Sequence, residues 1–148
     1  MNILHLYKDY FPVLGGIENY IKVLAEAQAA AEHQVSVLAC APGLRTQVER
    51  RSGVRVIKAG RLITAASMPL SLRQPLALTG LHPDVIHLHS PYPLGEVSAW
   101  LLKRRTPLII THHSDVVRQQ GWLRLYGPML RRVLRAADRV IATSPRYI

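Results

Sequence analysis

Residues 2–25 read NILHLYKDYFPVLGGIENYIKVLA and pass from a strand pattern to a helix pattern across two glycines. Residues 2–7 form a short apolar run that predicts a strand, and residues 8–16 follow it as a loop. From Ile17 to Ala25 the apolar residues recur at the three- and four-residue spacing of a helix. The stretch therefore predicts a strand, a glycine-containing loop and a helix, in that order.

The same alternation of strand and helix patterns continues along the chain. Further strands are predicted at 35–39, 54–59, 85–89, 108–111 and 140–143, and helices at 95–104 and 123–136, the last with a break or restart at Pro128. Residues 61–79 contain Pro69 and Pro75, which predict a loop with one short helical piece. Strands such as 108–110 are wholly apolar, which is typical of a parallel sheet covered on both faces. We therefore expect an α/β fold with a Rossmann-like, doubly wound parallel sheet, in a single domain over residues 1–148.

The composition restricts the environment and the partners of the protein. Lys and Arg exceed Asp and Glu by 19 to 9, a formal charge of +10, which indicates an anionic substrate or partner surface. The single cysteine, Cys40, excludes a disulfide within the chain and favours a reducing compartment. No stretch resembles a signal peptide or approaches the ~18 apolar residues of a membrane span. We expect a cytoplasmic protein, soluble or peripheral at the inner face of a membrane.

Ligands of doubly wound sheets bind where the strands end, and the first such loop carries Gly15 and Gly16. Two residues without side chains before a helix would let a phosphate approach the free N–H groups of the first helical turn. A plain turn between a strand and a helix explains the glycines equally well. The loop is neither Gly-x-Gly-x-x-Gly nor a P-loop, which disfavours a nicotinamide dehydrogenase or an NTPase. Glu18, Lys22 and Glu26 repeat at four-residue spacing and predict a solvated helix face.

Histidines follow the fourth and fifth predicted strands. His87 and His89 lie two apart and share a face, as a zinc-binding pair would, but no carboxylate or cysteine cluster completes a ligand set. We therefore expect no metal, with His87 packed in the sheet and His89 reaching the cleft. The adjacent His112 and His113 must point in opposite directions, so one of them faces the cleft. An imidazole there can bind a sugar hydroxyl, pair with a developing charge or anchor a loop.

Together these loops resemble the N-terminal domain of the group 1 (family 4) retaining glycosyltransferases, which have the two-Rossmann-domain GT-B architecture. The resemblance is carried by residues 10–18, 84–95, 111–115 and 137–145. It implies that Gly15 and Gly16 lie against the donor diphosphate and that His113 lies beside the transferred sugar as the catalytic residue. It also implies an acceptor side lined by Tyr10, Glu18, His89, Ser90, Asp115 and Arg118.

The resemblance implies a complete enzyme that transfers a sugar from a nucleotide-diphosphate donor to an acceptor hydroxyl, such as one on a lipid-linked or cell-envelope glycan, with retention. We expect residues 1–148 to lack the C-terminal donor-binding domain of that family, and therefore expect these residues alone to be inactive. No Asp-x-Asp is present, and we expect neither a divalent metal nor another cofactor. One departure is Glu32, where the family commonly has glycine; a left-handed conformation there would cost ~1 kcal/mol.

The basic segment at 118–139 leaves two interpretations open. Arg131, Arg132 and Arg135 lie beside an apolar stripe, which suits a helix on an anionic membrane surface or an ordinary amphipathic helix with a solvated basic face. Two other functions also remain: a zinc hydrolase built on His87 and His89, and a basic anion-binding module. We expect no nucleic-acid partner, because the exposed aromatic pattern of a single-strand binder and a helix-turn-helix signature are both missing.

Overall fold

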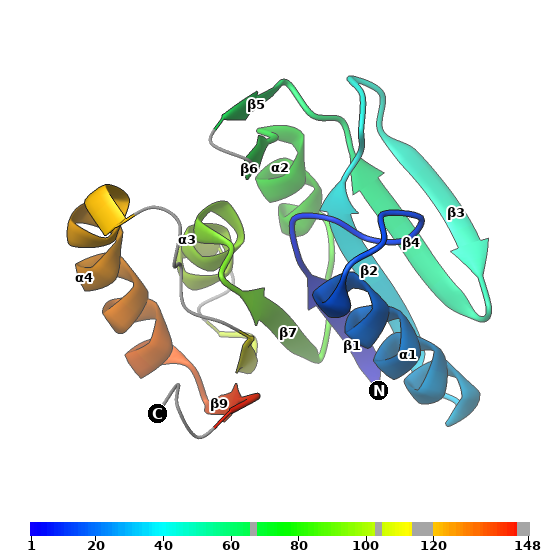
Figure 1. Ribbon diagram of the computed structural model, residues 1–148. Coiled ribbons are helices and arrows are strands. Elements are labelled where there is room, and N and C mark those ends of the chain that lie inside the picture. The colour runs from blue at the N-terminus through cyan, green and yellow to red at the C-terminus, as the bar shows by residue number, and fades with distance from the viewer. Residues whose placement is uncertain (66–67, 103–104, 114–119, 145–148) are drawn as a thin grey trace.

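The computed structural model describes residues 1–65, 68–102, 105–113 and 120–144. These residues form a sheet with the strand order β3-β4-β2-β1-β7-β8-β9, and a separate pair, β5 and β6 (Figure 1). The strands of the large sheet are β1 (Asn2–Leu6), β2 (Gln34–Cys40), β3 (Gln47–Arg51), β4 (Val54–Ala59), β7 (Val85–Ser90), β8 (Leu108–His112) and β9 (Arg139–Ala142). All neighbours run parallel except β3, which pairs antiparallel with β4. The predicted parallel α/β sheet is confirmed.

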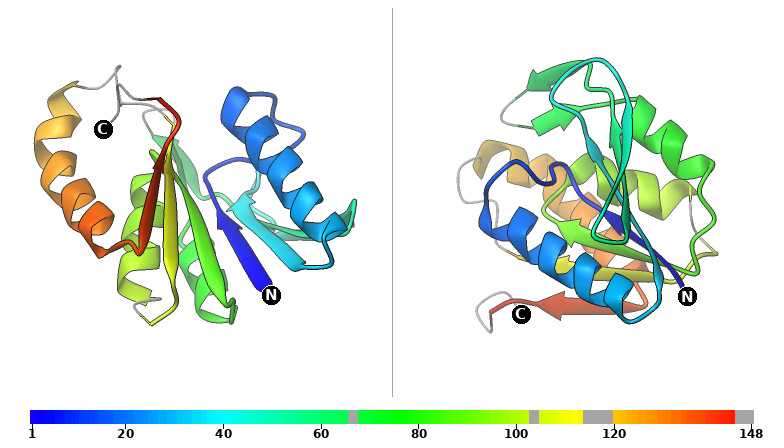
Figure 2. Two further views of the ribbon diagram at one scale, coloured as in Figure 1. Left: turned by 90° about the horizontal axis from the view of Figure 1, so that it is seen from below. Right: turned by 90° about the vertical axis from the view of Figure 1, so that its right-hand side faces the viewer.

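Helices cover both faces of this sheet. They are α1 (Gly16–Ala30), α2 (Arg73–Thr79), α3 (Pro93–Leu102) and α4 (Gln120–Ala136). Figure 2 shows α1 on one side of the strands and α2 and α3 on the other. Helix α4 joins the second side, because its buried Val133 belongs to the same cluster as residues of α2 and α3. The arrangement is therefore doubly wound, as expected.

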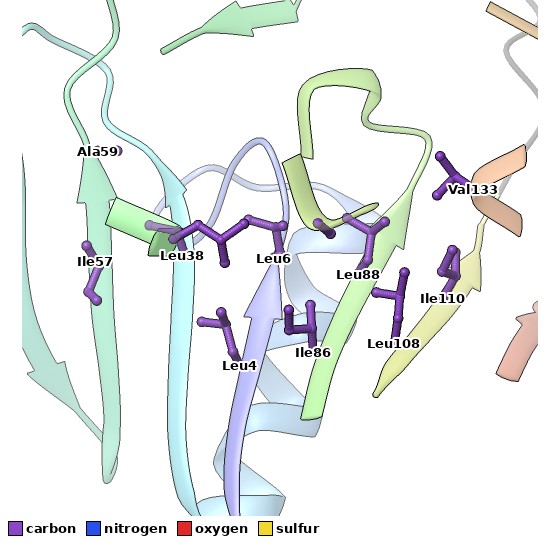
Figure 3. Packing of buried hydrophobic residues seen from close by; sticks show 12 residues of the cluster. Leu4, Leu6, Leu38, Ile57, Ala59, Ile86, Leu88, Leu108, Ile110 and Val133 are labelled. Atoms are coloured by element: carbon purple, nitrogen blue, oxygen red, sulfur yellow. The ribbon is translucent and has the colours of Figure 1, made fainter. Parts of the chain in front are cut away.

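Alternation along the strands gives the two faces different chemistry. On the side of α2, α3 and α4 the buried residues are aliphatic, as the row of Leu6, Ile86, Leu88 and Ile110 shows (Figure 3). The intervening residues of β1 and β7 point toward α1, and they include three of the histidines. Because His5 lies opposite His87 in the register of these two parallel strands, the histidines come together beneath α1.

Three local features differ from, or add to, the sequence prediction. Strand β3 was not predicted, because all its residues are exposed on an antiparallel edge and give no buried apolar pattern. Residues 61–79 contain the predicted short helix, α2, together with the unpredicted pair β5 (Ile63–Ala65) and β6 (Met68–Leu70). The predicted break at Pro128 is wrong. Helix α4 runs through this exposed proline, where water can bind the carbonyl group that lacks its partner.

At the end of α1, Glu32 does adopt the left-handed conformation considered above, with a φ of 63°. The N–H of His33 donates to the Gln28 carbonyl at 3.2 Å, and the N–H of Glu32 donates to the Ala29 carbonyl at 3.1 Å. This pair of bonds is a Schellman motif, in which a left-handed residue ends the helix. It also fixes the helical turn that carries Gln28.

Candidate functional site

Three predicted loops meet at one edge of the sheet. Strands β1, β7 and β8 are neighbours and run parallel, so their carboxyl ends lie side by side (Figure 1). His113 follows β8 directly, and its N–H donates to the Ser90 carbonyl at 3.0 Å, which ties the ends of β7 and β8 together. The loop after β1 leads to Gly15 and Gly16 at the start of α1 on the same edge. This edge is the candidate site.

Gly15 and Gly16 differ in what surrounds them. Both are exposed; Gly15 is the extended residue before α1, and Gly16 is its first residue. A Cβ added to Gly16 would meet no atom within 4 Å, whereas one on Gly15 would lie 2.1 Å from Oε2 of Glu18. The Glu18 carboxylate therefore folds back over Gly15, near the positive end of the helix dipole. With 9% of its surface exposed, Glu18 is buried, so the prediction that it lies on a solvated face is wrong.

The histidines form a continuous hydrogen-bonded chain. Nε2 of His113 lies 3.1 Å from Nδ1 of His89, and Nε2 of His89 lies 3.1 Å from Nδ1 of His5. Nε2 of His5 in turn lies 2.7 Å from Oε1 of Gln28 on α1. We call these four residues, Gln28, His5, His89 and His113, the histidine chain. It runs from the interior beneath α1 to the candidate site.

Burial separates the members of this group. His5 and His89 are fully buried, whereas His113 is partly exposed. His87 is buried as predicted; its Nε2 contacts the Thr111 hydroxyl at 2.7 Å and its ring stacks on that of His89 at 4.4 Å. The expectation that the His89 ring itself reaches the cleft is wrong, because His89 is fully buried, with its ring stacked against that of His113 at 5.4 Å. A direct role for His89 in binding the acceptor stays a prediction.

Burial also keeps these imidazoles uncharged. Desolvation lowers the pKa of His5 to about 4 and that of His87 to about 3, and it holds the pKa of His89 well below 6.5. The pKa of His113 is lowered by burial and by the neighbouring His112. The rings are therefore neutral at pH 7, where each carries a single N–H.

These pKa shifts make stability depend on pH. A histidine with a lowered folded pKa stabilises the protein above pH 6.5, and this contribution is lost as the pH falls toward the folded value. We expect the free energy of unfolding to fall from pH 6.5 to 4.5 by about 1.4 kcal/mol per pH unit for each such histidine. Urea unfolding at a series of pH values measures the slope. His5→Gln should reduce this slope by about 1.4 kcal/mol per pH unit, which corresponds to one proton. A free energy of unfolding that does not change with pH in the parent protein would contradict the expectation.

The opposite face of the same strand ends holds a second buried network, centred on Glu96. Its Oε1 accepts hydrogen bonds from the Ser90 hydroxyl at 2.8 Å and from the Tyr92 N–H at 3.0 Å, and its Oε2 accepts one from the Tyr126 hydroxyl. Nδ1 of His112 lies 3.2 Å from the Ser90 hydroxyl. We call these five residues the Glu96 network. It joins β7, α3, β8 and α4.

The Glu96 network and the histidine chain show in which direction each of the adjacent side chains of His112 and His113 points. His112 turns into this network while His113 turns toward α1, so the prediction that they point in opposite directions is confirmed. Glu96 is fully buried, and desolvation raises its pKa. Ser90 is fully buried too, and its hydroxyl is engaged here. Its predicted contact with the acceptor stays a prediction.

Two tyrosines near the site behave differently. Tyr10 is buried in the cluster under α1, where desolvation raises its pKa to about 12. Tyr20 is 39% exposed, and its ring meets that of His113 edge-on at 5.0 Å and that of His89 at 6.0 Å. Tyr20 was not predicted as a site residue, because its helical spacing groups it with core positions. Asp115 and Arg118 lie outside the described residues.

A metal ion is a further candidate for this site. The ligand nitrogens of His5, His87 and His89 lie within 4.8 Å of one another. Within the described ranges no cysteine or carboxylate joins them as a potential ligand. The expectation that the protein uses no metal stays a prediction.

One hollow among the described residues lies away from the candidate site. A cavity of about 350 Å³ is lined by Asn2, His33, Gln34, Val35, Ser36, Arg50, Gly53 and Arg55. Asn2 and Gln34 are the first residues of their parallel strands, so the cavity is at the amino ends, opposite the candidate site. It contains none of the predicted site residues.

Helix α4 presents its basic residues to solvent. Arg131, Arg132 and Arg135 are exposed, and Val133 between them is fully buried. Both the membrane-surface helix and the ordinary amphipathic helix match this pattern. In the part of the chain that the structure describes, no helix combines the length and the apolar character needed to cross a membrane. Membrane contact by these arginines stays a prediction.

Comparison with known proteins gives consistent similarities. A family described as Glycosyltransferase Family 4 matches residues 14–147. The O-antigen chain mannosyltransferase C of Escherichia coli is 31% identical over 151 residues, covering 100% of this chain and 41% of the relative. The D-rhamnosyltransferase WbpZ of Pseudomonas aeruginosa is also 31% identical, with 99% and 39% covered. A GDP-mannose-dependent alpha-mannosyltransferase of Mycobacterium tuberculosis is 29% identical, with 93% and 40% covered. The chain thus spans about two fifths of the length of these relatives.

Proposed function

Because the chain belongs to glycosyltransferase family 4, we propose that it forms the acceptor-side part of an enzyme that transfers a sugar from a nucleotide-diphosphate donor to a hydroxyl group, with retention at the anomeric carbon. The family confirms the resemblance seen in the sequence. The observation that carries the proposed reaction is the meeting of Gly16 and His113 at one edge of the sheet, Gly16 facing open space.

In the proposed reaction the start of α1 receives the donor diphosphate. The first turn of a helix has N–H groups without partners and a partial positive charge. The absence of a side chain at Gly16 lets phosphate oxygens come close to the backbone. Negative charge grows on the leaving diphosphate as the sugar departs, so fixed donors at this place stabilise the transition state.

His113 lies beside the transferred sugar in this proposal. It is neutral and partly exposed, and Tyr20 covers one side of its ring. Such a group positions a sugar and interacts with its hydroxyls, but it carries no charge for a direct ion pair with the diphosphate. We assign no enzymic nucleophile.

The names of the relatives suggest which donors to test. Two of the three relatives are mannosyltransferases, one of them described as dependent on GDP-mannose, and the third is a rhamnosyltransferase. We propose GDP-mannose and a nucleotide-activated rhamnose as the first donors. The proposed acceptor is a growing glycan of the cell envelope, in keeping with the O-antigen mannosyltransferase among the relatives.

The activity is assigned to the full-length protein. By the family resemblance, a second domain would bind the nucleotide and close over the start of α1 and His113. We therefore expect residues 1–148 alone to show no turnover. Turnover by this segment at the rate of the full-length protein would contradict the division of roles.

The proposal is tested by incubating the full-length protein with GDP-mannose or nucleotide-activated rhamnose and a glycan acceptor. Transfer of the sugar with the anomeric configuration of the donor, read by NMR of the product, is the expected result. Activity should persist in EDTA. An inverted product would overturn the retaining mechanism, and hydrolysis of a non-glycosidic substrate supported by bound zinc would favour the hydrolase alternative.

Gly16→Ala tests the diphosphate cradle without disturbing the fold. A methyl group at this exposed position meets no protein atom, and alanine favours the helix more than glycine does. The free energy of unfolding should stay equal or rise, while kcat/KM falls about a hundredfold, as when one transition-state donor is lost.

Gly127→Ala is the matched control, because it is also a helical glycine with no atom within 4 Å of the added Cβ, but it lies on α4. It should leave kcat/KM unchanged and raise stability by up to about 1 kcal/mol. If Gly16→Ala retained full activity, Gly16 would lie outside the cradle.

A further inference from the structure

We propose that the histidine chain holds His113 as the neutral tautomer that is protonated at Nε2, so that its Nδ1 is a hydrogen-bond acceptor for a hydroxyl group of the bound ligand. Gln28, His5 and His89 are then positioning residues that act through His113. The tautomer follows from the contacts within the chain. The identity of the ligand as a sugar rests on the proposed function.

Gln28 sets the direction of the hydrogen bonds. Its Oε1 lies 2.7 Å from Nε2 of His5, and a carbonyl oxygen can only accept. His5 must therefore carry its proton on Nε2. The backbone of Gln28 is fixed by the Schellman motif at the end of α1, where its carbonyl accepts the N–H of His33 at 3.2 Å.

The donor-to-acceptor direction of the hydrogen bond from His5 to Gln28 then determines that of the next one along the histidine chain. A neutral imidazole has one donor and one acceptor nitrogen, so Nδ1 of His5 accepts and Nε2 of His89 donates to it. By the same step Nδ1 of His89 accepts from Nε2 of His113. With neutral rings and the Gln28 oxygen as the final acceptor, this is the assignment that satisfies all three contacts. It leaves Nδ1 of the partly exposed His113 unprotonated.

The surroundings favour neutral rings. His5 and His89 are fully buried, and their pKa values are lowered mainly by desolvation. On α1, Lys22 and Glu26 form an ion pair with each other at 2.8 Å, and the Glu18 carboxylate folds back over Gly15. The Tyr20 ring covers His89 and His113 edge-on. Among the described residues, no carboxylate contributes to the pKa shifts of His5, His89 or His113, so a proton added to the histidine chain would be buried at a cost.

A metal ion would use the same atoms differently. A metal ion bound to both His5 and His89 would take from each ring a nitrogen already engaged in the histidine chain, as Nδ1 of His5 and Nε2 of His89 are with each other at 3.1 Å. Metal binding and the histidine chain therefore exclude each other at this contact. The hydrogen-bonded arrangement accounts for each nitrogen in the chain up to Nε2 of His113 without an added ion.

The tautomer has a consequence for recognition. An unprotonated Nδ1 can accept from a hydroxyl group but repels the lone pairs of a phosphate oxygen. His113 would therefore favour the hydroxyl-bearing part of the donor over its diphosphate. This assigns the sugar to the His113 side of the site and the diphosphate to the start of α1.

Nitrogen NMR of the full-length protein labelled with ¹⁵N-histidine tests the tautomer without any activity measurement. Protonated and unprotonated ring nitrogens have well-separated shifts. We expect His113, assigned by its loss in His113→Ala, to be protonated at Nε2 and unprotonated at Nδ1 at pH 7.5. A His113 that is protonated at Nδ1, or at both nitrogens, overturns the proposal.

Gln28→Met tests whether the direction comes from Gln28. Methionine keeps the length of the side chain and removes the oxygen. The hydrogen bonds of the histidine chain can then point in either direction, so His113 should become a mixture of both tautomers. The control Gln47→Met makes the same change on the exposed strand β3 and should leave the spectrum unchanged. A single unchanged His113 tautomer in Gln28→Met overturns the role of Gln28; should that variant fail to fold, the parent spectrum still decides the tautomer.

Two further measurements separate the alternatives. Adding one equivalent of ZnCl₂ should leave the His5 and His89 nitrogens unshifted, and a joint shift of Nδ1 of His5 and Nε2 of His89 would identify a metal site and overturn the proposal. A set of donors that each lack one sugar hydroxyl should include one that the parent protein uses with a lower kcat/KM than the complete donor. In His113→Ala, this donor and the complete donor should have equal kcat/KM. The NMR result can hold when no transfer is found, so failure of the tautomer and failure of the proposed function are distinguishable.

Discussion

Replacing His113 with alanine should lower kcat/KM for sugar transfer about a hundredfold while reducing the free energy of unfolding by only about 1 kcal/mol. The ring is partly exposed, and within the histidine chain it uses one nitrogen, so its loss leaves one buried acceptor, Nδ1 of His89, without its donor. The transfer reaction loses the group beside the sugar. Steady-state kinetics of the full-length protein and urea unfolding measure the two effects.

The adjacent residue is the matched control. His112→Ala removes a buried ring that contacts the Ser90 hydroxyl, so it should cost more stability than His113→Ala and change kcat less in the molecules that remain folded. Equal effects of the two substitutions on stability and on kcat would contradict the assignment of the two rings to different faces.

Glu96→Ala should destabilise the protein by about 3–5 kcal/mol, the largest loss expected from a single substitution at this edge of the sheet. The carboxylate is fully buried and accepts hydrogen bonds from Ser90, Tyr92 and Tyr126. Alanine would remove the acceptor of these three hydrogen bonds and open a cavity where β7, α3 and α4 meet. Urea unfolding of the full-length protein and of the variant measures the difference.

Glu96→Gln separates the hydrogen bonds from the charge. Its amide oxygen can still accept from Ser90 and Tyr92, so the loss should be smaller than for alanine. Burial raises the pKa of Glu96 above 4.5, so the contribution of this group to stability is present at acidic pH and decreases as the pH rises through the folded value. Glutamine should remove this decrease. Equal destabilisation by Gln and Ala would show that the retained amide oxygen does not replace the carboxyl group in this network.

Much of the fold could be predicted because it depends on local patterns. The apolar runs that form β7 and β8, and the glycines before α1, give a parallel α/β sheet without knowledge of any long-range contact. Strand β3 could not be predicted in this way. Its residues are all exposed, and it is a strand because its backbone pairs with β4, which is a tertiary contact.

The candidate site was predictable only in part, for a similar reason. Alternation along an extended chain separates His112 from His113, so that division could be read from sequence. The joining of His5 to His89 depends on how β1 and β7 align, and one sequence does not determine that register. Glu96 gave one signal, as the single charged residue of a mostly apolar helix, but its partners include residues of distant elements.

His112 and His113 are adjacent in sequence but have separate roles, one in packing and one in the proposed ligand contact, so each can change without the other. His112 belongs to the Glu96 network, which joins β7, α3, β8 and α4, whereas His113 belongs to the histidine chain beneath α1 and to the proposed ligand-binding surface. Substitutions around Tyr20 and Gln28 could therefore change which sugar is accepted while the opposite face keeps the strands in place. A single-residue insertion in β8 would exchange the two histidines, so this strand should tolerate substitution far better than a change of length.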